Sequence, residues 1–487
     1  MSTPFFPAWR ARLASFGRRA HHFRRQPLPQ LEKLLGHLLP PGLLLPPAHG
    51  TNSRQRLYSL PCTFWAFLWQ VLNPACPCRE VVRHLQALFC LRQRAGADGG
   101  TSAYCQARDR LPLSILQQAR VAAAAQAQKL LPQAQERWRG FAVKVADGTT
   151  IGLADTPKNQ RAYPQSSSQK PGCGFPFMKL VGLFSLETGA LLGCATGNKH
   201  QAELPLFRKL WGWLKPGDLL LADRGFASYV VLALLELLGV ACLFRLHQAR
   251  PSDLRKGIPL GRNDRLFTWS KPAQKPRWLA QSLWKKVPKE LVVRVLRVRA
   301  SVPGFRTQTM TLVTTLTDAE AFPAHELSGL YLRRWSIELW WRNIKTSMGM
   351  ETLSCLSPAM VHKELEMHLI AYNLIRCLMV EAAALHERPI ERLSFKGTTD
   401  AVRQFSPVIA QARPGKRRHA LIRKLLAATA GDLVPERPGR REPRAVKRRP
   451  KPYPLLTKPR NQFLEIPHRG KYRKANREQS NEYGRLI

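Results

Sequence analysis

Residues 218–247, DLLLADRGFASYVVLALLELLGVACLFRLH, decide the fold class of this chain. An apolar run ends at Asp223, a helix-forming segment covers Ser228 to Val240, and a second apolar run ends at His247. Buried strands on either side of a helix of this length are typical of a parallel strand–helix–strand unit. The stretch therefore predicts an α/β layer architecture.

The segments around this unit extend the same architecture. FAVKVADGTT at 141–150 predicts a strand that ends in a turn, and two strands joined by a turn at Glu187–Gly189 are expected over 177–197. Helical spacing or composition predicts helices at 202–214, 324–347 and 359–385, and strand character returns at 307–316.

The charge of the chain indicates a polyanionic partner. Lys and Arg outnumber Asp and Glu by 77 to 32, a net charge of +45. Nucleic acid is favoured, because clustered cations release the counterions of its phosphates. The open alternative is an arginine-rich composition inherited from a high-GC genome.

Other composition features exclude several classes of protein. No run of about 18 uncharged apolar residues occurs, so no membrane span is expected. The N-terminus lacks the apolar segment of a secretory signal. The ten cysteines show no zinc-binding spacing, which is typical of reduced thiols in a cytosolic protein.

Changes in charge, composition and hydrophobic pattern along the chain predict six regions. They are a basic, loosely structured arm (1–60), a helical DNA-binding domain (61–137), a first core segment (138–246), a β-rich insertion (247–305), a second core segment (306–390) and a basic C-terminal region (391–487). A plain helical bundle is an equal alternative for 61–137. The tail from Pro435 carries sixteen Lys and Arg against five acids, so we expect it to be ordered only by a partner.

Two aspartates follow apolar strands in this acid-poor chain. Asp147 comes after FAVKVA and Asp223 after DLLLA. Open α/β sheets place their sites at such strand ends, and a divalent cation would compensate two carboxylates near a core. The alternative is turn chemistry, because Asp before Gly or Arg-Gly is a common turn former.

The segment YLRRWSIELWWRNIK, residues 331–345, adds a third acid. At 100° per residue, Tyr331, Arg334, Glu338 and Lys345 fall within about 60° on one helix face. One carboxylate between cations is what metal-assisted phosphoryl transfer requires. A solvated face with an Arg334–Glu338 pair is the alternative, although the adjacent faces are apolar and predict a packed helix.

These motifs resemble the insertion-sequence-four-like bacterial transposases of the DDE type, within the RNase H-like and retroviral-integrase superfamily. Tyr331, Arg334, Glu338 and Lys345 match the family's Y-x2-R-x3-E-x6-K signature, and DGTT and ADRGF match its two acid motifs. The three acids are 76 and 115 residues apart, and the long second gap matches the β domain that the family inserts between the second aspartate and the glutamate. The resemblance covers roughly residues 100–390.

The resemblance implies an α/β RNase H-like catalytic core, a mixed sheet flanked by helices and interrupted by a β-rich insertion. Asp147, Asp223 and Glu338 would hold two Mg²⁺ ions, with Mn²⁺ able to substitute. Tyr331, Arg334 and Lys345 would hold backbone phosphates. The implied activity is cleavage of double-stranded DNA at terminal inverted repeats, through a hairpin in many members, and joining to target DNA by a synaptic homodimer. The expected location is the bacterial cytoplasm, associated with the nucleoid.

Some positions depart from the family or stay ambiguous. Met310 occupies the place of a tryptophan that stacks on hairpin DNA in some members, with Trp269, Trp278 and Trp284 as substitutes or as packing residues. Arg224 contacts phosphate or shapes a turn, and His200 is read as a helix-start residue. The competing functions are a nuclease of the RNase H or structure-selective type without joining activity, and an inactive copy that only binds DNA.

Overall fold

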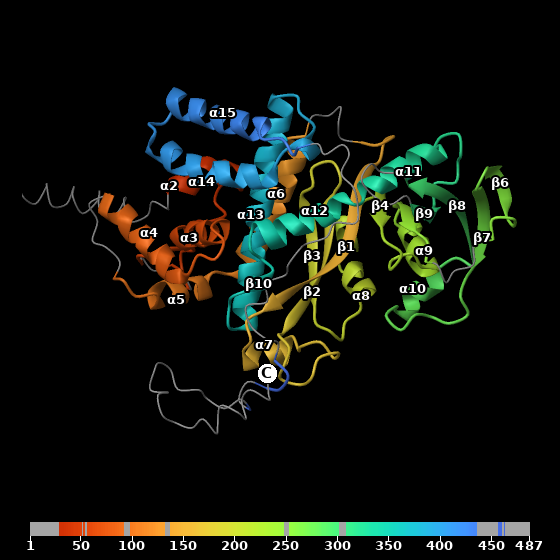
Figure 1. The fold of residues 1–487 in the computed structure, drawn as a ribbon, viewed down its shortest axis with the longest axis horizontal. Helices are drawn as coiled ribbons and strands as arrows, with labels where there is room; N and C mark the ends of the chain where they lie inside the picture. Colours follow the sequence, from red (N-terminus) through yellow and green to blue (C-terminus); the bar gives the residue numbers. More distant parts are fainter. Residues whose placement is uncertain are drawn as a thin grey trace, which may run out of the picture.

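The computed structural model describes residues 29–50, 52–53, 56–91, 98–131, 137–247, 253–300, 308–435, 456–459 and 462. A ten-stranded mixed sheet runs through the molecule, with helices on both faces (Figure 1). Its strands are β1 Ala142–Leu153, β2 Phe177–Ser185, β3 Leu191–Gly197, β4 Asp218–Ala222, β5 Ala241–Arg245, β6 Ile258–Gly261, β7 Asp264–Ser270, β8 Glu290–Ala300, β9 Gln308–Thr314 and β10 Thr352–Leu353.

The strand order is β3-β2-β1-β4-β5-β9-β8-β7-β6, with β10 paired to β1. Strand β1 is antiparallel to β2 and parallel to β4, which is in turn parallel to β5. Strand β9 closes this core antiparallel to β5, and β8, β7 and β6 continue the same sheet outward. Strands β6, β7 and β8 fall within the range predicted as a β-rich insertion, and they extend the core sheet.

Helices pack on both faces of the sheet because side chains alternate along β1. Val143 and Val145 join the cluster of buried residues formed with α6 and α13, whereas Ala146 joins the cluster formed with α8 and α9. The flanking helices are α6 Leu113–Lys129, α7 Pro157–Ala162, α8 Glu203–Arg208, η3 Trp211–Trp213, α9 Tyr229–Leu237, α10 Gln281–Lys286, α11 Ala324–Arg333, α12 Ser336–Arg342, the π-helical turn η4 Asn343–Ser347 and α13 Pro358–Leu385.

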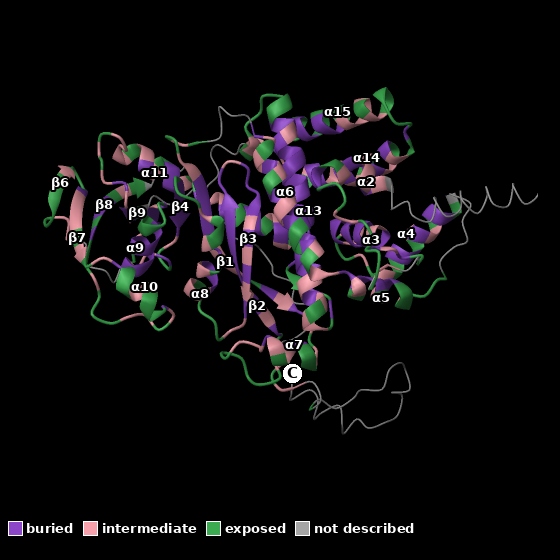
Figure 2. Cartoon of the chain, turned by 180° about the vertical axis from the view of Figure 1, so that it is seen from behind, coloured by how far each residue is buried: buried purple, intermediate pink, exposed green. Residues whose placement is uncertain are grey.

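Helix α13 is the centre of the helical side of the molecule, and Figure 2 shows it among the most buried elements. Around it gather helices from both ends of the chain: α2 Pro29–Leu35, η1 Gly36–Leu38, α3 Leu60–Leu72, α4 Cys78–Leu91, α5 Ser102–Arg110, η5 Ile390–Arg392, α14 Phe395–Gln411 and α15 Lys416–Gly431. Helix α13 is also long and apolar enough to cross a membrane, but 83% of its most apolar window is buried, as in a core helix of a soluble protein.

Several expectations are confirmed. The strand–helix–strand unit is β4, α9 and β5, and Ser228 caps α9 by accepting a hydrogen bond from the N–H of Val231. Strands β2 and β3 flank the expected turn, and α13 matches the helix expected over 359–385.

Three expectations need correction. Strand β1 does not turn at DGTT, because pairing with β2 continues to Gly152. Residues 29–38 are not a loose arm but form α2 and η1, whose leucines pack in the core. The sequence analysis did not predict the helices α14 and α15, which residues 395–431 of the basic C-terminal region form. The helix expected over 324–347 is divided into α11, α12 and η4. The tail beyond residue 435 lies largely outside the described residues.

The Asn373 side chain joins α13 to β3 and α6 by hydrogen bonds, and its loss should destabilise the protein. It is fully buried, donates to the carbonyls of Arg120 and Leu191, and accepts from the N–H of Leu191. Asn373→Leu should lower the free energy of unfolding by roughly 2–4 kcal/mol, because these backbone groups lose their partners. Urea denaturation measures the effect. Gln118→Leu, which replaces an exposed side-chain amide on α6, is the control, and an equal effect of both variants would contradict this role.

Candidate active site

The register of β1 and β4 brings the two predicted aspartates together. The last parallel pair is Ala146 with Ala222, so Asp147 and Asp223 follow at neighbouring positions on adjacent strands. Strand β4 ends there, and Asp223 begins a turn in which its carbonyl accepts a hydrogen bond from the N–H of Phe226. The turn alternative therefore describes Asp223 in part, but it is wrong for Asp147, which lies within β1.

The α11–α12 segment lies across this edge of the sheet and carries the third acid (Figure 1). The Tyr331 hydroxyl donates to the carbonyl of Ala222 at 3.3 Å, one residue before Asp223. Further along, the Lys345 ammonium lies 3.4 Å from Thr149 Oγ1, two residues after Asp147. The predicted stripe thus faces the two strands that carry the aspartates.

The helix break between α11 and α12 changes the geometry of this stripe. The N–H groups of Arg334 and Ile337 donate to carbonyls three residues earlier, so the segment is wound more tightly than an α-helix. Lys345 lies in the π-helical turn η4, which is wound more loosely. The two departures leave Tyr331 and Lys345 on the same side of the segment, as the regular helix predicted.

The surroundings of Asp147 disfavour its charged carboxylate form. Burial raises the pKa of Asp147 to about 6, and the nearby carboxylates of Asp223 and Glu338 add to the rise. The Arg334 guanidinium and the N–H of Gly148 act in the opposite direction, lowering that pKa. Asp147 therefore senses the charges of both other acids.

Arg334 and Glu338 differ sharply in exposure. The Arg334 side chain is 9% exposed and that of Glu338 is 60% exposed, with 3.7 Å between the guanidinium and the carboxylate. Within the described residues, Arg334 Nε is buried without a hydrogen-bond partner. The expected Arg334–Glu338 pair is present, but it is not a solvated face, because its cation is buried against the ring of Tyr331.

A cavity of about 320 Å³ opens beside these groups, lined by Asp147, Gly148, Thr149, Glu338, Trp341, Arg342, Lys345, Thr346 and Glu351. Its wall combines acids, cations and one indole ring. The cavity leaves Asp147 and Glu338 open to a ligand from solvent.

The remaining predicted residues are placed as follows. Arg224 is exposed beside Asp223. Met310 is only 3% exposed and pairs with Val298 in the sheet, so it offers no surface for base stacking in this conformation. Trp269, Trp278 and Trp284 pack against the core cluster on the α9 side, in agreement with the packing alternative.

The sequence interpretation overlooked Arg245 and Glu351. Arg245 ends β5, the strand next to β4. Its charge lowers the pKa of Tyr331, whereas the charge of Asp223 raises it. Its signal was a charged residue at the end of an apolar strand, the same pattern that identified Asp223. Glu351 lines the cavity and accepts from the Thr346 hydroxyl, and no sequence pattern pointed to it.

The donor set fits a hard divalent cation. Asp147, Asp223 and Glu338 offer carboxylate oxygens, which Mg²⁺ and Mn²⁺ prefer. Among the described residues, no three acidic, histidine or cysteine side chains converge closely enough to enclose one ion by themselves. An open carboxylate set suits Mg²⁺, which keeps several water ligands and accepts substrate phosphate oxygens.

Comparison with known proteins agrees with this chemistry. Residues 138–374 match the family model described as Transposase DDE domain. The chain is 30% identical over 438 residues to the transposase InsG for insertion sequence element IS4 from Escherichia coli strain K12, covering 87% of this chain and 94% of that protein. A piggyBac transposase in a synaptic complex with hairpin DNA aligns over 85% of this chain and 87% of that one, with 9% identity and a TM-score of 0.40, too distant to inform function.

The chain therefore belongs to the IS4 family of DDE transposases. It is an enzyme of the DDE type and a DNA transposase, a class that uses divalent metal ions and binds DNA.

The raised pKa of Asp147 makes a stability prediction for the metal-free protein. A carboxyl whose folded pKa is raised destabilises the fold above that pKa, and the penalty vanishes below the unfolded value of about 4. Asp147→Asn in EDTA should therefore be more stable than wild type at pH 8, by about 1–2 kcal/mol after allowance for partial exposure. The difference should shrink as the pH falls through 6, measured by urea denaturation.

The control for this comparison is Asp155→Asn, which alters an exposed aspartate just beyond β1. Its stability relative to wild type should not change in this way with pH. Equal or lower stability of Asp147→Asn at pH 8 would show that Asp147 carries no electrostatic penalty.

Proposed function

We propose that this transposase cleaves DNA at the terminal inverted repeats of its element and joins the freed 3′ ends to target DNA, using Asp147, Asp223 and Glu338 to hold two Mg²⁺ ions. The observation that carries the proposal is the β1–β4 register, which sets two acids side by side under the helix that bears the third. Bound there, the ions would activate the attacking hydroxyl and stabilise the leaving oxygen of an in-line displacement.

The cations around the acids support a role in gripping the DNA backbone. Nε of the buried Arg334 guanidinium has no hydrogen-bond partner in the part of the chain that the structure describes, and Lys345 reaches the cavity beside Thr149. Both could form charge-assisted hydrogen bonds to phosphate oxygens. Tyr331 has a different role in this proposal. Its hydroxyl already donates to the Ala222 carbonyl, so it holds the helix on β4. Arg224 and Arg245 add positive charge at the same edge.

The proposal includes the wider organisation of the protein. The order β3-β2-β1-β4-β5, antiparallel in its first three strands and parallel in the next two, supports an RNase H-like core. Two element ends must be processed together, which favours a synaptic homodimer. A net charge of +45 favours retention on the nucleoid in the cytoplasm. Mn²⁺ is expected to replace Mg²⁺, because both prefer oxygen ligands.

Removal of any one acid should abolish cleavage. Duplex DNA that carries the element's own inverted repeats is incubated with Mg²⁺ and wild type, Asp147→Asn, Asp223→Asn or Glu338→Gln. Each variant should cleave at least about 10³-fold more slowly, because the loss of a metal ligand removes activation of the nucleophile. Glu387→Gln, at an exposed position after α13, should cleave at the wild-type rate.

Two results would overturn parts of the proposal. Wild-type cleavage by Glu338→Gln would remove that residue from the site. Cleavage by wild type without any strand-transfer product would leave a nuclease activity without the joining step.

Lys345→Ala should weaken binding to the element ends and flatten its dependence on salt. The loss of one phosphate contact lowers the slope of log K against log salt by roughly one. Fluorescence anisotropy in Ca²⁺ between low and moderate salt measures this slope. Lys396→Ala is the control, because this lysine of α14 is exposed and pairs with Asp400. An unchanged slope in Lys345→Ala would exclude a direct phosphate contact.

A further inference from the structure

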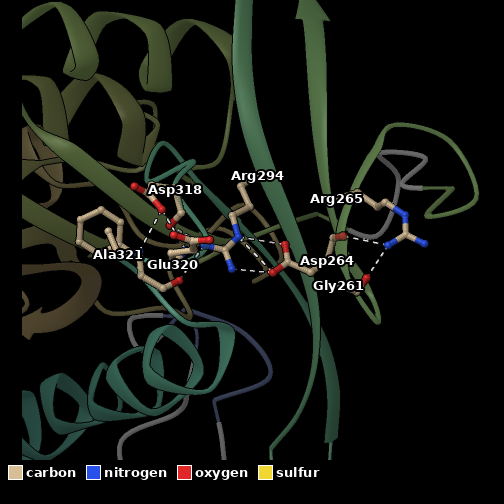
Figure 3. A network of polar contacts seen from close by, with 8 residues as sticks. Gly261, Asp264, Arg265, Arg294, Asp318, Glu320 and Ala321 are labelled. Atoms are coloured by element: carbon tan, nitrogen blue, oxygen red, sulfur yellow. Dashed lines mark hydrogen bonds and ion pairs between the residues drawn. The ribbon is translucent and has the colours of Figure 1, made fainter.

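A buried arginine joins the outer strands of the sheet to the segment that carries Glu338. Arg294 lies in the middle of β8 and is 1% exposed. It faces Asp264 of β7, itself 4% exposed, and the two form a bidentate pair with Nε 2.9 Å from Oδ1 (Figure 3). A fully buried cation in a strand needs such a partner.

The Arg294 guanidinium also forms hydrogen bonds beyond the outer strands. Arg294 Nη1 donates to the carbonyls of Asp318 at 3.2 Å and Phe322 at 2.7 Å. Both carbonyls belong to the connection between β9 and α11. The planar fork of arginine therefore fixes this connection against β7 and β8 in one geometry.

The connection is rigid in its own right. The Asp318 carboxylate accepts from the N–H groups of Glu320 and Ala321, each at 2.9 Å (Figure 3). Arg139, just before β1, also binds it, by donating to the carbonyl of Ala321 and by pairing with Glu326 in the first turn of α11. The start of α11 thus has few ways to move independently of β1 and β8.

Helix α11 is then held at both ends. The Arg294 network fixes its start, and the Tyr331 hydroxyl fixes its end to β4 beside Asp223. Glu338 follows seven residues after Tyr331 in the same segment. A shift at the start of α11 would therefore be transmitted to the Glu338 carboxylate.

Stability alone is a poor explanation of this network. Buried ion pairs can often be replaced by apolar residues at no cost in stability, whereas the geometry that they impose is specific. We propose that Arg294 is a positioning residue. Through Asp264 and the carbonyls of Asp318 and Phe322, it couples the outer strands β7 and β8 to the placement of Glu338. The catalytic consequence rests on the proposed function, in which Glu338 is a metal ligand.

The test compares Arg294→Lys with Arg297→Lys, the same exchange at an exposed position three residues along β8. Lysine keeps the charge but cannot reach Asp264 and two carbonyls at once. Hydrogen exchange over residues 324–342 should become faster in Arg294→Lys alone. The single-turnover cleavage rate should fall roughly tenfold to a hundredfold, as expected for a small misplacement of a catalytic group. The dissociation constant for DNA ends in Ca²⁺ should stay within about twofold of wild type.

A second variant covers the case in which Arg294→Lys fails to fold. Arg294→Met with Asp264→Leu removes both charges and should fold, but should show the same fast exchange and slow cleavage. Unchanged exchange in residues 324–342 would overturn the positioning role, whatever the cleavage rate. Faster exchange with full cleavage, while Glu338→Gln is inactive, would also overturn it. Full cleavage by Glu338→Gln would instead defeat the proposed function, and exchange alone would then decide whether Arg294 positions the segment.

Discussion

The parallel pairing of β1 with β4 is the contact on which the rest of the structure depends. It ends at Ala146 and Ala222, so that the next residue of each strand is an aspartate. Burial removes hydration from the Asp147 carboxylate and the neighbouring Asp223 repels it, and the pKa of Asp147, raised to about 6, expresses this cost. The buried guanidinium of Arg334 relieves part of it. A divalent cation would relieve the rest, so the strain of the metal-free site is itself a feature that favours metal binding.

The other elements hold a third acid over this edge. The α11–α12 segment is fixed to β4 by Tyr331 and to the outer strands by Arg294, and its buried side chains join the same hydrophobic cluster as α13 and the helices around it. Helices from both ends of the chain meet at α13, so the helical part and the sheet form one continuous structure (Figure 1). Any motion of the outer strands upon DNA contact would reach Glu338 through only Arg294, the β9–α11 connection and α11.

Local patterns predicted the strands and helices well where periodicity was strong, as in β4, α9 and β5. They failed where tertiary pairing overrides turn chemistry: nothing within DGTT indicates that β2 would hold β1 straight to Gly152. The helical stripe predicted which side of the segment faces the strands, although not its break at Arg334, which depends on packing. The sequence did not settle the exposure of single side chains, since Arg224 is exposed and Met310 is buried. The Arg294 network could not be predicted, because its partners, the Asp264 carboxylate and the carbonyls of Asp318 and Phe322, lie at least 24 residues away in sequence.

The central claim is that Asp147, Asp223 and Glu338 share one divalent-ion site. Fe²⁺ substituted for Mg²⁺, with ascorbate and peroxide, generates hydroxyl radicals that cut the protein backbone beside the ligands of the ion. Mass spectrometry of the fragments should locate three groups of cuts, around residues 147, 223 and 338, and excess Mg²⁺ should suppress all three together. Cuts at other positions, or cuts near 147 and 223 without any near 338, would contradict the claim.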